Sequence, residues 1–318
     1  MSQLSWKLCE SGGTPARKFP LLTSGLALWQ WRSAAQKAAL AANVPVTEVD
    51  WLLQEVAGLD RLSLRLESFK NLPQIPLQLS LEELEDLWQR RINEHLPVQY
   101  ITGVTPWRHF KLAVSPAVLI PRPETEYIID LAVAAVQNHD CQLESGHWAD
   151  LGTGSGAIAL GLAQALPKAT IHAVDCSAAA LAVARQNAQA VGLAHQIHFY
   201  QGSWWEPLDF KGQLSGVVSN PPYIPSQLVP QLQPEVALHE PSLALNGGDD
   251  GLDCIRHLVA TSADYLQPGG IWLIEMMAGQ AEVVAALLQS HGSYCDIEIY
   301  PDLAGIERFA LAYRRGEE

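Results

Sequence analysis

The segment "WADLGTGSGAIALGLAQAL", residues 148–166, places an apolar strand, three alternating glycines and an Ala- and Leu-rich helix in direct succession. A strand that passes into a helix through so short a turn begins a βα unit, and the next strand then lies parallel to the first. Further apolar strand candidates follow: "TIHAVD" (170–175), "QIHFYQG" (196–202), "GVVSN" (216–220), "GIWLIE" (270–275), "CDIEIYP" (295–301) and "ERFALAYR" (307–314). Their spacing predicts an α/β fold with a mostly parallel sheet, helices on both faces, and an antiparallel hairpin at one edge.

The part of the chain before residue 121 has a different pattern. Residues 22–97 contain three segments with apolar residues at helical spacing, and in the last of them Ser80 and Glu83 are placed as a capping box. Residues 98–120 are β-branched and aromatic with Gly and Pro between them, which predicts a hairpin-like linker. We therefore expect an N-terminal extension or disordered segment at 1–21, a helical domain at 22–97, the linker at 98–120, and the α/β domain at 121–318.

The glycine turn is the first candidate site. It consists of Gly152, Thr153, Gly154, Ser155 and Gly156. Its glycines can adopt positive φ and let a ligand approach the backbone closely. Three alternating glycines also occur in ordinary strand-to-helix turns, so the spacing alone is a weak signal. The next strand, however, ends in Asp175, at the position where an acid accepts hydrogen bonds from both ribose hydroxyl groups of an adenosine.

Two adenosine cofactors fit this turn to different degrees. NAD-binding turns usually follow G-x-G-x-x-G, because the pyrophosphate sits on the helix N-terminus. Here the spacing is G-x-G-x-G, Asp150 precedes it, and no basic residue is placed to bind a phosphate. A cofactor with no phosphate and a cationic sulfonium suits the turn better, so S-adenosylmethionine is favoured over NAD.

The second candidate site is "VVSNPPYIPSQ", residues 217–227. Pro221 and Pro222 fix φ and remove two backbone donors, so the fourth strand cannot continue through them. This strand should end beside the first, at the sheet edge where open α/β folds bind ligands. The rigid bend can then aim two acceptors together, the side-chain carbonyl of Asn220 and the backbone carbonyl of Pro221, while Tyr223 offers a flat ring for stacking.

Such a pair of acceptors suits a planar NH₂ group, either a side-chain amide or the exocyclic amine of a base. An amide nitrogen is a poor nucleophile because its lone pair is delocalised into the carbonyl. Acceptors on both N–H bonds would favour a pyramidal nitrogen and direct its lone pair at the methyl carbon. Alignment of this kind can lower a barrier by about 7–11 kcal/mol. We predict Asn220, Pro221 and Tyr223 as catalytic residues, with Pro222 also binding the substrate.

The composition limits the alternatives. The net charge is −14, from 20 Lys and Arg against 34 Asp and Glu, which argues against tight general binding to DNA. No apolar run reaches the roughly 18 residues of a membrane span, and no secretory signal is recognisable. Scattered cysteines and histidines predict neither a disulfide framework nor a metal site. We expect a cytoplasmic protein with no membrane partner and no stable nucleic-acid binding.

The sequence resembles the release-factor glutamine methyltransferases, which methylate the side-chain amide nitrogen of the glutamine in the GGQ motif of peptide-chain release factors. Besides the two motifs, the resemblance rests on "PVQYITGVTPWRHFKLAVSPAVLIPRPETEYII" (97–129), "HEPSLALNGGDDGLDCIRHL" (239–258) and "PDLAGIERFALAYR" (301–314). It extends from about residue 25 to 315. One departure follows "IE", where the family usually shows a Gly but this chain has Met276, Met277 and Ala278, which should alter a wall near the cofactor.

The resemblance implies a class I, Rossmann-like methyltransferase domain that uses S-adenosylmethionine, and an N-terminal helical domain that helps to dock the release factor. It implies that the turn from Gly152 to Gly156 cradles the cofactor and that Asp175 holds its ribose. Trp204, in "QGSWWEP", should contact the adenine ring. The residues from Asn220 to Tyr223 should grip the glutamine, with Asn220 also near the methyl donor.

Other functions remain open at this point. An adenine-N6 methyltransferase could use the same grip on a flipped base, although the acidic net charge disfavours it. A ribosomal-protein glutamine methyltransferase would share the amide chemistry, and "IPRPETE" favours the release-factor branch instead. A non-catalytic binding module would have little need for a pre-aimed pair of acceptors. Within "IPRPETE", we expect Glu124 and Glu126 to order the loop rather than to touch the cofactor.

Overall fold

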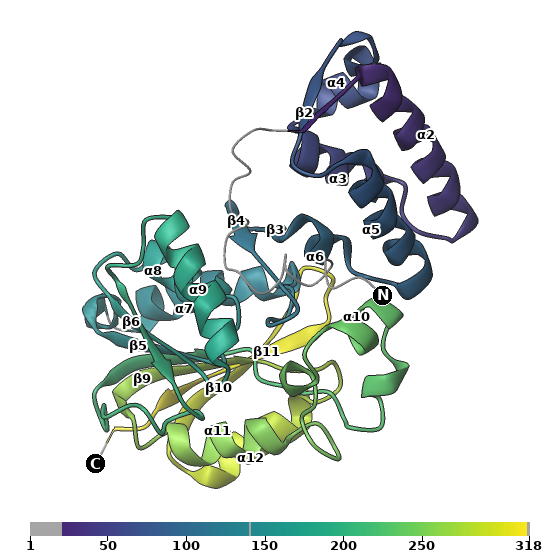
Figure 1. Ribbon diagram of the computed structural model, residues 1–318. Helices are drawn as coiled ribbons and strands as arrows, with labels where there is room; N and C mark the ends of the chain where they lie inside the picture. Colours follow the sequence, from purple (N-terminus) through teal and green to yellow (C-terminus); the bar gives the residue numbers. More distant parts are fainter. Residues whose placement is uncertain (1–20, 140, 317–318) are drawn as a thin grey trace. The chain divides into compact units, whose positions relative to one another are not determined.

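The computed structural model describes residues 21–139 and 141–316, and the chain divides into two compact units (Figure 1). Unit 1 comprises the residues up to Val104 together with Gln233–His239. Unit 2 comprises Thr105–Leu232 and the residues from Glu240 onward. The extension predicted at 1–21 lies outside the described residues except for Leu21. None of the helices in 21–139 and 141–316 is both long enough and apolar enough to cross a membrane.

Unit 1 is mostly helical. Its elements are β1 (Leu21–Thr23), α2 (Gly25–Ala41), α3 (Thr47–Ala57), α4 (Arg61–Leu66), η1 (Ser68–Asn71), β2 (Ile75–Leu77), α5 (Leu81–Glu94), α6 (Val98–Thr102) and α10 (Pro234–His239). Helices α2, α3 and α5 correspond to the three segments with helical spacing. The predicted capping box is confirmed: Ser80 Oγ accepts the N–H of Glu83 at 3.1 Å, and Glu83 Oε2 accepts the N–H of Ser80 at 2.8 Å.

Two tryptophans organise the core of unit 1. Trp88 on α5 is fully buried, and its indole N–H donates to the carbonyl of Ala35 at 3.2 Å. The ring of Trp31 meets that of Trp88 edge-on, with centroids 6.5 Å apart. Helix α2 can begin against η1 only because residue 25 is glycine, since a Cβ there would lie 1.9 Å from the carbonyl oxygen of Phe69.

Arg91 joins α10 to the helices that precede it in unit 1. Its guanidinium pairs with both carboxylate oxygens of Glu48, at 2.7 and 3.0 Å, and with Glu235 of α10 at 2.9 Å. The side chain of Arg91 is only 5% exposed, so three charge-assisted hydrogen bonds offset its burial. A short helix far along the sequence thereby becomes part of this unit.

Unit 2 is built on a seven-stranded sheet of order β10-β11-β9-β8-β5-β6-β7. The strands are β5 (His147–Leu151), β6 (Thr170–Asp175), β7 (Ile197–Gln201), β8 (Leu214–Ser219), β9 (Leu266–Glu275), β10 (Tyr294–Pro301) and β11 (Glu307–Arg314). Strands β5 to β9 are mutually parallel, and β11 runs antiparallel to both β9 and β10. The predicted fold class is confirmed, including the hairpin of β10 and β11 at one edge.

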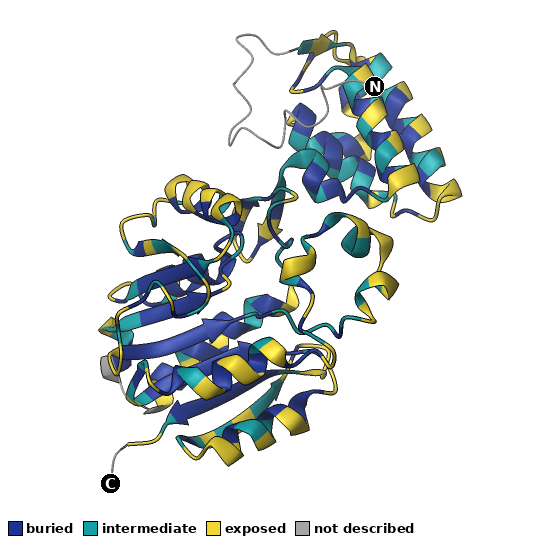
Figure 2. Ribbon diagram, turned by 60° about the horizontal axis from the view of Figure 1, so that its bottom comes forward, coloured by how far each residue is buried: buried dark blue, intermediate teal, exposed yellow. Residues whose placement is uncertain are grey.

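Helices cover both faces of this sheet (Figure 1). They are α7 (Tyr127–His139), α8 (Ala157–Ala165), α9 (Ala178–Ala190), α11 (Asp253–Ser262) and α12 (Ala281–His291). Neighbouring residues of β5 pack into two different hydrophobic clusters. Trp148 packs in the cluster that holds residues of α7 and α8, and Ala149 packs in the cluster that holds residues of α11 and α12. The inner strands β5, β6 and β8 are accordingly buried on both sides, and buried residues are dark blue in Figure 2.

The segment expected to be a hairpin-like linker begins differently. Residues Val98–Thr102 form the short helix α6, which is too brief to give a periodic signal in the sequence. The hairpin then consists of β3 (Val104–Trp107) and β4 (Phe110–Ala113). Short turns η2 (Glu124–Glu126), η3 (Cys141–Ser145), η4 (Val229–Gln231) and η5 (Ser242–Ala244) complete the unit.

Three histidines from neighbouring strands meet in the sheet. The Nε2 of His172 lies 3.0 Å from the Nδ1 of His147, and its Nδ1 lies 3.1 Å from the hydroxyl of Tyr200. The ring of His198 stacks on that of His172, which is only 2% exposed. Burial, together with the two neighbouring imidazoles, lowers the pKa of His172 to about 4.

Acidification should therefore destabilise the fold through His172. This side chain takes up a proton near pH 6.5 in the unfolded chain but only near pH 4 in the folded one, so stability falls as the pH drops through that window. Between pH 7 and pH 5 the loss in unfolding free energy should be on the order of 1–2 kcal/mol. Urea unfolding of wild type and His172→Asn at both pH values measures it. The variant should lose less on acidification; an equal loss would exclude this titration.

Candidate functional site

A cavity of about 320 Å³ lies in unit 2 at the carboxyl ends of the parallel strands. Gly152 follows β5, Asp175 ends β6, Gly202 follows β7 and Asn220 follows β8, and all four line the cavity. This is the edge at which open α/β sheets bind ligands, because the connections there leave a crevice. The parallel pairing thus brings both predicted motifs to one site.

Two of the turn glycines form part of the cavity wall. Gly152 and Gly154 have φ of 76° and 53°, a region that side chains disfavour. A Cβ added at Gly152 would meet no atom within 4 Å, so a side chain there would project into the space that a ligand can use. The backbone of this turn is open to close approach by a ligand.

The other three turn residues lie behind this wall. The Oγ1 of Thr153 donates to Asp150 Oδ2 at 2.6 Å, and the carbonyl of Ser155 accepts from the side-chain amide of Asn187 at 2.9 Å. Gly156 precedes α8 with φ of 83°, and a Cβ there would lie 3.1 Å from the Cβ of Ala184. These residues hold the turn in shape and do not line the cavity.

Asp150 holds the glycine turn in place through hydrogen bonds to Thr153 and Ala159. It is fully buried, and its Oδ2 accepts from Thr153 and from the N–H of Ala159 at 3.0 Å. Its Oδ1 has no hydrogen-bond partner among the described residues. Burial raises the pKa of Asp150 to about 7, with the nearby charge of Asp175 adding to the rise.

Asp175 meets the requirements for holding a ribose. Its Oδ2 accepts the N–H of Gly154 at 2.9 Å and its Oδ1 accepts the N–H of Ser177 at 2.8 Å. A carboxylate has about four lone-pair sites, so each oxygen can accept another hydrogen bond from a ligand hydroxyl. Asp175 is the only charged residue among those that line the cavity in the described part of the chain. With no cation to neutralise phosphates, the cavity fits a neutral or cationic adenosine cofactor better than a dinucleotide.

Trp204 also lines the cavity, in a strained conformation. Its φ is 50°, which is rare for a bulky residue, and strained residues of this kind tend to cluster at functional sites. The indole ring lies 6.0 Å from the ring of His257 on α11 and is half-buried. A flat, partly exposed ring at this position can stack on a planar ligand group.

The bend after β8 presents its acceptors without internal partners. The Nδ2 of Asn220 donates to the Oγ1 of Thr125 at 3.2 Å, whereas the Oδ1 of Asn220 makes no hydrogen bond within residues 21–139 and 141–316. The backbone carbonyl of Pro221 likewise accepts none from these residues. Asn220 and Pro222 line the cavity, while Pro221 is buried beside them. Neither predicted acceptor is therefore engaged by another described residue, and Asn220 lies on the cavity wall.

Tyr223 is held by one hydrogen bond from its side-chain hydroxyl and one to its backbone carbonyl. Its hydroxyl donates to Glu275 Oε1 at 3.0 Å, and its carbonyl accepts from the side-chain amide of Gln280 at 3.1 Å. The ring is half-buried and does not line the 320 Å³ cavity. Burial and the adjacent Glu275 raise the pKa of Tyr223 well above its usual value, so its hydroxyl stays protonated.

The "IPRPETE" segment orders the loops around the site. Arg122 pairs with the buried Glu240 at 2.8 Å, and the carbonyl of Arg122 accepts from the indole of Trp107 at 3.1 Å. As expected, Glu126 has a structural role, since its Oε1 accepts the N–H of Arg108 at 2.7 Å. The position of the segment is thus fixed by contacts that are distant in sequence.

Sequence reasoning missed part of the cavity wall. These lining residues come from the stretch after β4, from the loop after α10 and from α11: Ala117, Val118, Leu119, Pro241, Leu243, Ala244, Asn246 and Cys254. All eight lie in segments that carried the family resemblance, but nothing in their residue types indicated a ligand. The expected change of wall at 276–278 was wrong: Met276 is fully buried in the core, and Met276, Met277 and Ala278 do not line the cavity.

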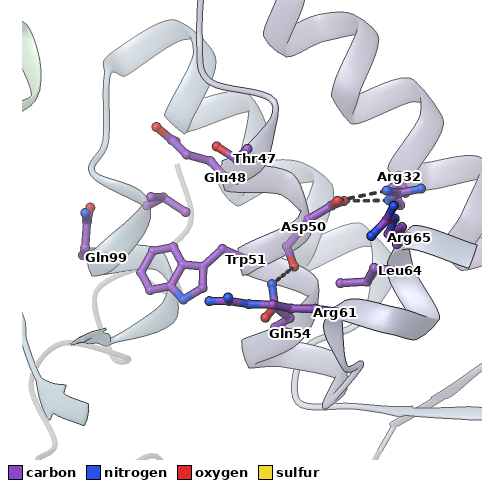
Figure 3. A pocket seen from close by; sticks show the side chains of 11 residues that line it. Arg32, Thr47, Glu48, Asp50, Trp51, Gln54, Arg61, Leu64, Arg65 and Gln99 are labelled. Carbon is purple, nitrogen blue, oxygen red and sulfur yellow. Dashed lines mark hydrogen bonds and ion pairs between the residues drawn. The ribbon is translucent and has the colours of Figure 1, made fainter. Parts of the chain in front are cut away.

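Unit 1 has a cavity of its own, of about 700 Å³ (Figure 3). Asp50 on its wall pairs with Arg32 through both oxygens, at 2.7 and 3.0 Å. Arg61 and Arg65, both exposed, make no ion pair or hydrogen bond with the described residues. The half-buried ring of Trp51 lies between these groups and the opposite wall. The acids of this cavity are paired and two of its arginines are not.

Two family descriptions match the chain, the Methyltransferase small domain at residues 128–237 and the PrmC N-terminal domain at residues 30–103. The release factor glutamine methyltransferase of Synechocystis sp. is 52% identical over 293 residues, which cover 91% of this chain and 97% of that protein. Its namesake in Thermosynechococcus vestitus is 48% identical over 292 residues, covering 91% and 99%. The catalytic domain of hMettl16 has a similar fold, with a TM-score of 0.50 and 14% identity over 77% of this chain and 86% of that one.

Arg122→Met should destabilise unit 2 by about 2 kcal/mol at pH 8, because it leaves the buried Glu240 without its cation. Burial already raises the pKa of Glu240, and losing Arg122 raises it further. The variant's deficit should therefore shrink at pH 5, where Glu240 is more often protonated and neutral.

Urea unfolding at pH 8 and pH 5 measures both deficits. The double variant Arg122→Met/Glu240→Gln is the control, because it removes the charge that Arg122 neutralises. It should be less destabilised at pH 8 than Arg122→Met alone. A deficit that is independent of pH would contradict the role given to this ion pair.

Proposed function

Because this chain belongs to the release factor glutamine methyltransferase family, we propose that it transfers the methyl group of S-adenosylmethionine to the side-chain amide nitrogen, N5, of a release-factor glutamine. The glutamine is that of the GGQ motif, as the resemblance implies. The observation that carries the proposal is the pair of unengaged acceptors, Asn220 Oδ1 and the Pro221 carbonyl, next to the cavity with Gly152 and Asp175. The enzyme is a methyltransferase that depends on S-adenosylmethionine.

When bound, S-adenosylmethionine supplies a methyl group activated by its sulfonium. Gly152 and Gly154 leave room for it beside the backbone, while Thr153, Ser155 and Gly156 keep the turn in shape. Asp175 accepts the ribose hydroxyl groups with the lone pairs that Gly154 and Ser177 leave free. Trp204 provides a flat surface for the adenine.

The chain's own contribution to the chemistry is the placement of the amide. Asn220 Oδ1 and the Pro221 carbonyl accept the two N–H bonds, so the nitrogen lone pair points away from them toward the methyl donor. Pro222 and the ring of Tyr223 confine the plane of the amide. The nitrogen becomes acidic only as it gains positive charge, so no base is required before transfer, and the excess proton then passes to water. Orientation of this kind is worth about 7–11 kcal/mol when the reacting atoms are aligned.

Unit 1 serves to dock the release factor. Its cavity offers Arg61 and Arg65 without internal partners, and the half-buried Trp51 beside them, on a chain whose net charge is −14. Unpaired arginines next to an indole are suited to an acidic protein segment. We expect no stable binding to nucleic acid, because the overall charge is repulsive. The protein is proposed to act in the cytoplasm, where release factors work.

Mass spectrometry of a release factor incubated with the enzyme and isotopically labelled S-adenosylmethionine tests the activity and the position together. The label should appear on the GGQ glutamine and on no other residue. Asn220→Ala should bind the cofactor within several-fold of wild type but lose about 10²–10³ in kcat, the scale of one oriented hydrogen-bonding group. Unchanged turnover of this variant would exclude the proposed grip.

Reversing two charges in unit 1 tests the docking role. Arg61→Glu/Arg65→Glu should raise the KM for an intact release factor about tenfold, with little change in the affinity for S-adenosylmethionine. Because the attraction is electrostatic, the wild-type KM should rise with salt more steeply than that of the variant. Arg61→Lys/Arg65→Lys keeps the charge and is the matched control. Equal KM values in all three enzymes would place the docking surface elsewhere.

A further inference from the structure

We propose that Thr125 is a positioning residue for methyl transfer, whose hydroxyl group fixes the side-chain amide of Asn220 so that the carbonyl oxygen, and not the NH₂ group, faces the substrate. This inference deepens the proposed function and rests on it. Thr125 lies in η2, far from Asn220 in the sequence, and is 4% exposed. Its side chain does not line the cavity, so it acts through Asn220.

The need for such a residue follows from the asparagine side chain itself. Its amide has an acceptor end and a donor end of nearly the same shape, and a rotation of half a turn exchanges them. An acceptor can hold an N–H bond of the substrate glutamine, whereas an NH₂ group in the same place would repel it. The free side chain has no strong preference between the two orientations. A neighbouring group must therefore select one of them.

Thr125 occupies the place from which this selection is possible. The Nδ2 of Asn220 lies 3.2 Å from Thr125 Oγ1, while Asn220 Oδ1 has no partner among the described residues. A hydroxyl group can both donate and accept, so this contact alone does not fix the orientation of the amide. It does so only when the hydroxyl proton of Thr125 is engaged elsewhere.

Glu275, at the end of β9, is the acceptor proposed for this proton. Its side chain is 1% exposed, and its Oε1 already accepts from the hydroxyl of Tyr223. Its Oε2 is buried and has no hydrogen-bond partner among the described residues, so it can accept a proton donor. Burial raises the pKa of Glu275, and the hydroxyl of Thr125 is the largest influence that lowers it, followed by that of Tyr223. With its proton directed at this unpartnered oxygen, Thr125 has a lone pair left to accept from the Nδ2 of Asn220.

One buried carboxylate therefore sets the direction of two hydroxyl groups. Tyr223 donates its hydroxyl proton to Glu275 Oε1; in the proposed arrangement Thr125 donates to Glu275 Oε2 and thereby accepts from Asn220. While Glu275 is ionised it can only accept, which makes the arrangement one-way. A glutamine at position 275 could donate to Thr125 instead, which would free the threonine proton to hold Asn220 Oδ1 in the wrong orientation.

The test compares Thr125→Val, which has the same shape without the hydroxyl, with Thr125→Ser, which keeps it. We expect Thr125→Val to lower kcat on the release factor about 10- to 100-fold and Thr125→Ser to stay within about threefold of wild type. Affinity for S-adenosylmethionine should be unchanged in both. Affinity for the release factor, measured with S-adenosylhomocysteine bound, should fall in Thr125→Val and recover in Thr125→Ser. Glu275→Gln should resemble Thr125→Val.

A double-mutant cycle separates positioning from general support of the fold. If Thr125 acts through Asn220, then Thr125→Val should have little further effect in an Asn220→Ala background. Should Thr125→Val turn over like wild type, or lower kcat equally in both backgrounds, the inference fails. Thermal unfolding checks that each variant is folded. If Thr125→Val does not fold, Glu275→Gln tests the same hydrogen bonds from Glu275 through Thr125 to Asn220. Failure of wild type to label the GGQ glutamine would instead overturn the proposed function.

Discussion

The parallel pairing of β5 with β8 is the constraint on which the site depends. In this register Trp148 lies opposite Gly216 and Asp150 opposite Val218, so the two strands end together. Gly216 makes the register possible, because a Cβ there would lie 2.3 Å from the ring of Trp148. Next to Val218, Ser219 donates its hydroxyl to the carbonyl of Leu151 at 2.6 Å, which ties the last residues of both strands to each other. The glycine turn and the Asn-Pro-Pro-Tyr bend consequently leave the sheet side by side.

Buried carboxylates around this edge keep the loops in place at a cost to stability. Of the four buried side-chain atoms without a hydrogen bond in the described residues, three are carboxylate oxygens, of Asp150, Glu240 and Glu275. Each of these acids has a pKa raised by burial, and each holds a different loop: the glycine turn, the "IPRPETE" segment and the bend at Tyr223. Uncompensated polar atoms are expensive in an interior. Their gathering at one site is typical of local stability given up for an ordered active site.

The cavities of the two units differ in the charge of the residues that line them. In unit 2 the cavity has a single charged wall residue, Asp175, and otherwise small, apolar or neutral side chains, which suits a ligand held by shape and hydrogen bonds. In unit 1 the cavity is lined by charges, several of them already paired internally, with Arg61 and Arg65 left over. This contrast fits the proposed roles of a cofactor site in unit 2 and a docking surface in unit 1, because a buried ligand needs shape complementarity while protein docking profits from charge.

The amino-acid sequence determined those features whose cause is local. Alternating apolar segments fixed the strands, helical spacing fixed α2, α3 and α5, and the glycines and prolines fixed where the chain had to turn. Asp175 and Asn220 could be singled out because Asp175 ends a strand and Asn220 directly follows one at the ligand-binding edge. Thr125, Glu275 and the cavity wall at 117–119 could not, since their roles arise from contacts such as Thr125 with Asn220, 95 residues apart. No local pattern records such a contact; only the packing of distant segments, driven by burial of the sheet on both faces, decides which polar groups meet.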